Sequence, residues 1–446
     1  MRSLGWHLGA KTVTTGTTTP CGTAAAGGAT TATTPAQFEE IAASIRSDLV
    51  AHSLPSLAVA VARGGEVLWE QGFGWADREA RRLATEHTSY SLASISKPIT
   101  ATGLAVLVER GLINLDAPID NYLGAAKLNA GAAAVVGASD SSGATVRRVA
   151  NHTSGLPLHY HFFYQDEPAF ARPPFEETIL RYANLVTPPG THYQYSNLGY
   201  GLLDHIISTV SRRSYADFMA GEVFQPLGMT RTSIDIAPGL EPFAAVRYAR
   251  NGARVPFYTF DHPGGSAVWS SAHDLVRFGM YHLHNTVPGQ AAILSHEAID
   301  EMHLDTTNGM VNRETGAGYG LGWAVMPPRA SSSIGTTSGW TNWRPKIISH
   351  TGGMGGVSTA LMILPEHDIA VAVLCNAAHS LPHCVAERLL SVLLPDSGLV
   401  PTPMPAPPAP GRPTTAPSPF PSTQDGRAGR PNSPRFEPKV RAQVFA

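Results

Sequence analysis

Runs of β-forming residues stand near both ends of the chain's apolar-rich part, and helical patterns fill the stretch between them. Residues 57–63 and 66–74 flank Gly64-Gly65, a typical hairpin turn. Shorter β-type runs return far along the chain, at residues 320–325, 356–364 and 369–375. This order predicts an α+β protein with one sheet built from both halves of the chain and a helical domain inserted after the first hairpin.

Apolar residues recur at helical spacing in several segments. Phe38, Ile41, Ile45 and Leu49 predict an opening helix after Pro35. Ser271-Ala272-His273-Asp274 has the form of a capping box at a helix start. We therefore expect helices in four further regions, at residues 95–110, 200–219, from 272 through 283, and 382–394.

Composition divides the chain further. Residues 1–35 are rich in Thr, Ala and Gly, and residues 397–446 are rich in Pro with little periodic apolar content. Neither end can bury enough surface to offset its ordering entropy, so both are predicted to be disordered. Between them we expect a sheet domain formed by residues 36–98 and 255–396 and a helical domain at residues 99–254.

The charge balance excludes several classes of protein. The 446 residues carry 32 basic and 34 acidic side chains, a formal net charge of -2. No basic block suited to nucleic acid and no apolar run long enough to span a membrane is present in the sequence. Because no secretory signal is evident after Met1, a cytoplasmic location is favoured, although export is not settled by the sequence.

Cysteine usage gives no sign of a disulfide framework. The three cysteines stand at positions 21, 375 and 384, which is too few for a disulfide scaffold or a Cys-rich zinc site. Cys375 and Cys384 are predicted to be small buried residues.

The first chemical motif is Ser94-Ile95-Ser96-Lys97. This spacing places a hydroxyl and an amine one helical turn apart on the same face, where the amine can act on the hydroxyl proton. Alone the motif is weak evidence, because Ser-x-x-Lys pairs also arise by chance.

Two further motifs carry polar groups suited to catalysis. Tyr195-Ser196-Asn197 precedes a predicted helix, and the Tyr195 phenol is a useful base only if a cation such as Lys97 lowers its pKa. Asn197 could equally cap that helix. His350-Thr351-Gly352-Gly353 joins a short apolar run to a predicted Gly-rich turn, where a backbone N–H could approach a substrate oxygen.

Taken in order, Ser94-x-x-Lys97, Tyr195-x-Asn197 and His350-Thr351-Gly352 resemble the three boxes of the serine β-lactamase and penicillin-binding-protein superfamily. Four flanking segments are similar to the class C β-lactamase-related branch, which includes family VIII esterases: residues 91–98, 151–157, 226–229 and 318–323. The resemblance covers nearly all of residues 36–394. It implies a β-lactamase/transpeptidase-like fold, with an antiparallel sheet flanked by helices and an inserted all-helical domain.

The same resemblance implies roles for individual residues. Ser94 would form an acyl-enzyme, and Lys97 and Tyr195 would share the transfer of its proton. Asn197 would orient Lys97 and contact the substrate's carbonyl side. The backbone N–H groups of Ser94 and Gly353 would form the oxyanion hole, with His350, Thr351 and Gly352 beside the substrate.

No cofactor and no metal are expected on this basis. The pair His159 and His161 is interpreted as cleft-rim or surface histidines. The expected partner is a small-molecule ester or amide, with no nucleic acid and no membrane, and the sequence does not predict the oligomeric state.

One box departs from the common β-lactamase form, which has Lys where this chain has His350. A histidine is mostly neutral at pH 7 and offers no permanent cation to a substrate carboxylate. A His-Thr-Gly box is also found in related D-alanyl-D-alanine carboxypeptidases and some family VIII carboxylesterases. The preferred prediction is a carboxylesterase acting on small acyl esters.

Other functions stay open. They are a D-alanyl-D-alanine carboxypeptidase or D-aminopeptidase, a true β-lactamase, and a catalytically silent homologue that binds ligand. An α/β-hydrolase is excluded because no serine stands in Gly-x-Ser-x-Gly. Candidate walls of the substrate cleft are the aromatic residues of two loops, Tyr160, Phe162, Phe163 and Tyr164 on one and Trp340 and Trp343 on the other.

Overall fold

The computed structural model describes residues 34–131, 140–313, 315–328, 345–397, 399, 401–404 and 406. Within these residues, the main sheet has eight strands in the order β3-β2-β1-β13-β12-β11-β10-β9. All of its pairings are antiparallel. The strands are β1 (Ser56–Arg63), β2 (Glu66–Asp77), β3 (Arg82–Leu83), β9 (Gly318–Tyr319), β10 (Ala324–Met326), β11 (Ile347–Met354), β12 (Val357–Leu364) and β13 (Ile369–Cys375).

The predicted hairpin and the joining of the two chain halves are both confirmed. Gly64 and Gly65 have φ values of +62° and +80°, which a two-residue turn between β1 and β2 requires. The other edge of β1 pairs with β13, with Ala58 opposite Leu374. The strands at the middle of the sheet, β1 and β13, therefore come from opposite ends of the described chain.

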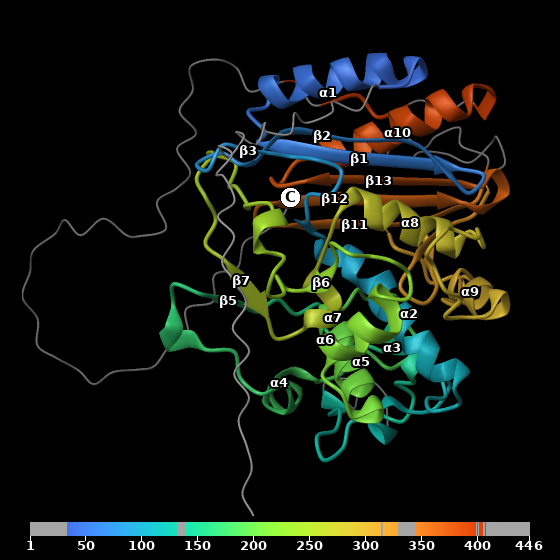
Figure 1. Ribbon diagram of the computed structural model, residues 1–446. Helices are drawn as coiled ribbons and strands as arrows, with labels where there is room; N and C mark the ends of the chain where they lie inside the picture. Colours follow the sequence, from blue (N-terminus) through green and yellow to red (C-terminus); the bar gives the residue numbers. More distant parts are fainter. Residues whose placement is uncertain are drawn as a thin grey trace, which may run out of the picture. The chain divides into compact units, whose positions relative to one another are not determined.

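Helices cover both faces of this sheet (Figure 1), with α1 (Glu39–Ala51) and α10 (Leu381–Leu393) on one face and α8 (Ala272–His282) on the other. Successive side chains of β1 point to opposite faces of the sheet, so the strand contributes to the packing under both layers of helices. Leu57, Val59 and Val61 belong to the core under α1 and α10, and the small residues Ala58, Ala60 and Ala62 face the opposite side. That small-residue surface lets α8 approach closely, since a Cβ on Gly279 would lie 3.0 Å from the Cβ of Ala370.

The chain between the two halves of the sheet is mainly helical, as predicted. Short strands add a three-stranded sheet of β4 (Tyr90–Ser91), β8 (Val268–Ser270) and β6 (Ser233–Ile234), and a pair of β5 (Phe162–Tyr164) with β7 (Tyr258–Phe260). The helices are α2 (Ser96–Glu109), α3 (Val146–Ala150), α4 (Phe175–Tyr182), α5 (Asn197–Ser211), α6 (Tyr215–Met219), α7 (Pro263–Ser266) and α9 (His296–Met302). The helix predicted at residues 200–219 is interrupted at Arg212, which adopts a left-handed conformation with φ +58°.

Two predictions need correction. Residues 350–353 do not form a turn, because β11 continues through them and pairs with β12 up to Met354. The predicted disordered tail also begins too early: Leu399 is buried in the core under α10, Met404 packs against that core, and the Thr402 N–H donates to Glu387 Oε2 at 2.6 Å.

Residues 1–33 and nearly all of 405–446 lie outside the described residues, so the predicted disorder there stays a prediction, as does the division into a sheet and a helical domain. In the described part of the chain, no helix is long and apolar enough to cross a membrane. Cys375 and Cys384 are buried and unpaired, as predicted, and Cys21 lies outside the described residues.

Candidate active site

Ser94 stands on a tight turn between a strand and a helix. It is the middle residue of η2 (Ala93–Ile95), directly before α2, and Ala93 has a left-handed φ of +49°. The turn is held from both sides, because the Leu92 N–H donates to Val268 O at 2.8 Å and Thr359 Oγ1 donates to Leu92 O at 2.9 Å. A strained residue held in this way fixes the direction of the serine that follows it.

Lys97 lies at the start of α2 and is completely buried. Its Nζ donates to Asn197 Oδ1 at 2.7 Å and to Gly265 O at 3.0 Å. Burial lowers the pKa of Lys97 well below its usual value, so the neutral amine forms more readily than at an exposed lysine. A neutral amine that donates its two hydrogens in this way keeps its lone pair for a proton.

Tyr195 lines the same cavity as Ser94, and Lys97 Nζ lies 4.6 Å from the centre of the Tyr195 ring. Burial raises the pKa of Tyr195 well above its usual value. The expectation that Lys97 lowers this pKa is therefore not met. Tyr195 keeps its proton, and the buried amine is the better acceptor.

Asn197 is the first residue of α5, but its side chain does not cap that helix. The N-cap is Ser196, whose Oγ accepts from the Gly199 N–H at 2.9 Å. The Asn197 side chain instead joins two segments, accepting from Lys97 through Oδ1 and donating from Nδ2 to the His159 carbonyl at 3.1 Å. The arrangement suits the predicted orienting role.

His350 is buried on β11, with both ring nitrogens engaged. Nδ1 lies 2.7 Å from the carbonyl of Thr351, which can only accept, so we assign the ring proton to Nδ1. Nε2 then accepts from the Tyr319 hydroxyl at 2.7 Å. Burial lowers the pKa of His350 to about 3, so this side chain is neutral at pH 7.

The two glycines of the third box serve different purposes. A Cβ on Gly352 would lie 2.1 Å from Leu92 O, so only glycine lets β11 approach the turn that carries Ser94. A Cβ on Gly353 would meet nothing within 4 Å, and Gly353 lines the cavity beside Ser94. Because β10 pairs only with residues 347–349 of β11, backbone groups of residues 350–354 lie beyond that pairing.

Sequence reasoning assigned no role to His152 or Tyr319, although both lie in segments that carry the family resemblance. His152 is buried, has a left-handed φ of +64°, and places its ring 4.3 Å from that of Tyr195. Its Nδ1 accepts from the Ser196 N–H at 3.1 Å. His152 thus supports the Tyr195 loop, and Tyr319 supports His350.

A cavity of about 300 Å³ opens at Ser94. Its lining includes Tyr193, Tyr195 and Tyr319 as aromatic walls. The loop aromatics predicted for this task are placed differently. Phe162 and Tyr164 belong to β5 and pack against Tyr258, and neither is among the described lining residues. Phe163 and Tyr160 are also absent from that lining, and Trp340 and Trp343 lie outside the described residues.

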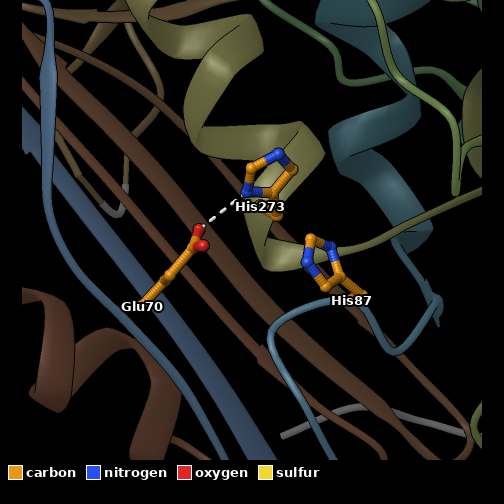
Figure 2. Close-up of side chains that lie close together, drawn as sticks. All are labelled: Glu70, His87 and His273. Carbon is orange, nitrogen blue, oxygen red and sulfur yellow. Dashed lines mark hydrogen bonds and ion pairs between the residues drawn. The ribbon is translucent and has the colours of Figure 1, made fainter. Parts of the chain in front are cut away.

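Two groups of side chains in the described residues have the composition of a metal site. Figure 2 shows the first, in which His273 Nδ1 lies 2.8 Å from Glu70 Oε2 and His87 stands beside them. The second is formed by His159, His161 and Asp261. Of the pair interpreted as cleft-rim or surface histidines, His161 has a side chain that is 31% exposed, whereas that of His159 is only 5% exposed.

A serine on a strained turn, beside a tyrosine and followed by a buried lysine, is the arrangement typical of serine hydrolases that use a Ser-x-x-Lys motif. A family model described as Beta-lactamase matches residues 23–393, and the chain belongs to this family.

Curated relatives and solved structures agree with this assignment. Penicillin-binding protein 4* of Bacillus subtilis is 27% identical over 71% of this chain and 67% of its own length. D-alanyl-D-alanine-carboxypeptidase/endopeptidase AmpH of Escherichia coli is 26% identical over 63% of this chain and 69% of its own length. A class C β-lactamase from Rhodobacter sphaeroides has the same fold, with a TM-score of 0.62 at 24% identity, covering 79% of this chain and 98% of that structure.

Proposed function

We propose that this protein hydrolyses small acyl esters through an acyl-enzyme on Ser94. Ser94 Oγ attacks the ester carbonyl carbon, and its proton passes through Tyr195 to Lys97. The N–H groups of Ser94 and Gly353 stabilise the negative oxygen that develops. Lys97 then returns the proton, through Tyr195, to the departing alkoxide. A water molecule then attacks the acyl-enzyme carbonyl in the same way. Its proton passes by way of Tyr195 and Lys97 to Ser94 Oγ, and the carboxylic acid is released.

The surroundings of Ser94, Tyr195 and Lys97 support these roles in proton transfer. Burial raises the pKa of Tyr195, so this side chain, which lines the cavity with Ser94, can accept one proton only as it passes on another. Lys97 is buried with a lowered pKa and is oriented by Asn197. The amine is thus the group that stores the proton between the two halves of the reaction.

The preference for an ester rests on one observation, the electrically neutral third box. His350 is neutral and is engaged with Tyr319 and Thr351. Among the described residues that line the cavity there is no Lys or Arg. A substrate carboxylate would lose its hydration there without gaining a cationic partner, whereas a neutral ester would not incur this cost.

A D-alanyl-D-alanine carboxypeptidase or D-aminopeptidase is the second candidate, and a β-lactamase the third. The similarity to AmpH and to penicillin-binding protein 4* favours the second. A catalytically silent ligand-binding protein is the least favoured, because Ser94, Lys97, Tyr195 and Asn197 are all present and in contact as a chain of side chains.

The test is a direct comparison of substrates on the purified protein. We expect turnover of p-nitrophenyl acetate and butyrate to exceed that of nitrocefin and of a D-alanyl-D-alanine peptide. Ser94→Ala should abolish it. Ser96→Ala is the matched control: Ser96 Oγ accepts from the Val268 N–H at 3.0 Å, so its loss should reduce stability but not remove the nucleophile. Faster turnover of the peptide than of any ester would contradict the ester assignment.

The substitution His350→Lys separates the substrate classes further. If the substrate is neutral, KM for a p-nitrophenyl ester should be nearly unchanged. KM for a carboxylate-terminated D-alanyl ester should fall, since the new cation gives that carboxylate a partner. A wild-type enzyme that already turns over the carboxylate ester far faster than the neutral one would refute the esterase proposal.

A further inference from the structure

A second cluster of functional groups lies next to Asn197 but outside the residues that line the cavity. It consists of His159 and His161, on the loop before β5, and Asp261, directly after β7. Asp261 Oδ2 is 2.9 Å from His159 Nε2 and 3.3 Å from His161 Nδ1. The potential ligand atoms of all three residues lie within 4.8 Å of one another.

The carboxylate at the centre of this cluster is completely buried. Within the described part of the chain, the ion-pair partners of Asp261 are the three histidines His159, His161 and His262, with no Lys or Arg among them. A buried carboxylate needs a compensating positive charge. A divalent cation bound between the carboxylate and the imidazoles would supply this charge at the point where the three groups converge.

Surrounding groups hold the carboxylate in a fixed direction. His262 Nδ1 lies 2.7 Å from Asp261 Oδ1, and Thr178 Oγ1 donates to Oδ2 at 3.2 Å. Outer hydrogen bonds of this kind orient the ligands of metal sites. His159 also adopts a left-handed φ of +58°, which a non-glycine residue keeps only when its surroundings impose it.

We propose that His159 Nε2, His161 Nδ1 and Asp261 Oδ2 bind one divalent cation of the zinc class. A tetrahedral zinc ion with bonds of about 2.0–2.1 Å places its ligand atoms about 3.3 Å apart. The His161–Asp261 separation of 3.3 Å matches this spacing, and the His159–Asp261 separation of 2.9 Å would have to widen slightly when the ion binds. Two imidazoles and one carboxylate favour zinc over calcium or magnesium, which prefer oxygen ligands alone. The His161 side chain is 31% exposed, so a fourth position can be taken by water.

The ion would position Asn197 without touching the reacting atoms. Asn197 Nδ2 donates to the carbonyl of His159, itself a proposed ligand, and the Asn197 N–H donates to Leu158 O at 2.8 Å. An ion that fixes His159 would therefore fix the loop that holds Asn197 and, through it, Lys97. Metal binding can be measured independently of any catalytic activity, so this inference does not depend on the proposed function.

The cluster in Figure 2 provides a matched control, because it has the same kinds of ligand on the protein surface. The His87 side chain is 47% exposed, and Glu70 and His273 are both about one-quarter exposed. These side chains are more exposed and are not arranged around a buried charge. We therefore expect this group to bind zinc far more weakly.

The experiment starts from the full chain stripped of metal with a chelator. Titration with Zn²⁺, followed by desalting and elemental analysis, should give one tightly held zinc per chain, and Co²⁺ should give the visible absorption bands of a tetrahedral site. His161→Ala should weaken Zn²⁺ binding by about 100-fold or more, while His87→Ala should not change it. Asp261→Asn, which keeps the side chain's shape, should act like His161→Ala.

Circular dichroism of each variant shows whether it is folded. His161 is the safest of the three ligands to replace because it is partly exposed. The proposal fails if no zinc is retained by the folded wild-type chain. It also fails if folded His161→Ala binds zinc as tightly as wild type, or if His87→Ala is the variant that loses it.

Discussion

The two faces of the main sheet are packed in opposite ways. Against α1 and α10 the buried centre of the sheet presents mainly apolar side chains, such as Val59, Val371 and Val373. On the other side, beyond the small residues that face α8, the core around α2 and α5 encloses a polar layer, defined here as Ser96, Lys97, Thr100, His152 and Asn197, all buried.

The difference shows how stability and chemistry are separated in one molecule. Apolar contacts are non-directional, so the α1/α10 layer needs only shape and hydrophobicity. Each buried polar group instead needs a partner at a fixed distance, and losing one leaves the other unsatisfied. Thr100 shows this dependence, since its Oγ1 lies 2.9 Å from Ser96 O and 2.7 Å from the Tyr215 hydroxyl. The polar layer is the more costly to build and the more specific.

The largest effect that separates the two layers is expected for Lys97→Met. The variant keeps the packing of the stem but removes the amine that stores the proton, so kcat should fall by about 10³-fold or more. Unfolding free energy should fall by no more than about 1–3 kcal/mol, because the loss of the donor to Asn197 Oδ1 and Gly265 O is offset by the removal of the amine's desolvation cost. Steady-state kinetics and urea unfolding on the same sample check both. Retention of more than a tenth of kcat would show that Lys97 is not the proton acceptor.

Leu389→Ala should give the reverse result. Leu389 is completely buried on α10, and its truncation should lower the unfolding free energy by about 3 kcal/mol. The kcat/KM of the molecules that remain folded should be unchanged, because the polar layer lies on the other side of the sheet. A parallel loss of kcat/KM at low temperature would show that the two layers are coupled.

A smaller effect is expected where the chain leaves α10. A chain ending at Ser397 loses Leu399, Thr402 and Met404, whereas a chain ending at Ala406 keeps them. The shorter chain should be less stable by about 2 kcal/mol, the value of one buried leucine side chain. Urea unfolding of the two truncations measures the difference directly. Equal stabilities would mean that these residues add nothing to the apolar layer.

A further effect is a pH dependence that originates at His282, the last residue of α8. Burial lowers the pKa of His282 from its usual 6.5 to about 3. Between these values the unfolded chain binds a proton that the folded protein does not, so stability is present above about pH 6.5 and is lost as the pH falls toward 3. This histidine contributes a slope of up to about 1.4 kcal/mol per pH unit.

The substitution His282→Gln tests that slope rather than absolute stability. The pH dependence of the unfolding free energy between about pH 4.5 and 7 should become flatter than in wild type. His192→Gln, at an exposed position, serves as control. An unchanged slope in His282→Gln would assign the acid sensitivity to other groups.

The apolar layer could be predicted from the sequence, and much of the polar layer could not. The helical spacing of apolar residues was sufficient to predict α1, and the Gly-Gly turn was sufficient to predict the β1–β2 hairpin. The Gly-Gly pair after Thr351 predicted a turn, but pairing with β12 keeps these residues in a strand. The role of His152 depends on a ring contact with Tyr195 across 43 residues of chain, and Asp261 meets His159 across a longer gap. Contacts between residues so far apart leave no local pattern.

Because β1 pairs with β13, the main sheet cannot be completed until β13 has been synthesised. The hairpin β1–β2 emerges from the ribosome early, but the partner of its inner edge is made only after Ile369 to Cys375 have been translated. Until then the edge of β1 that will pair with β13 has no strand beside it. An unpaired edge on an apolar strand promotes association with other chains. A nascent chain of this protein is therefore most in need of a chaperone throughout the translation of its helical middle.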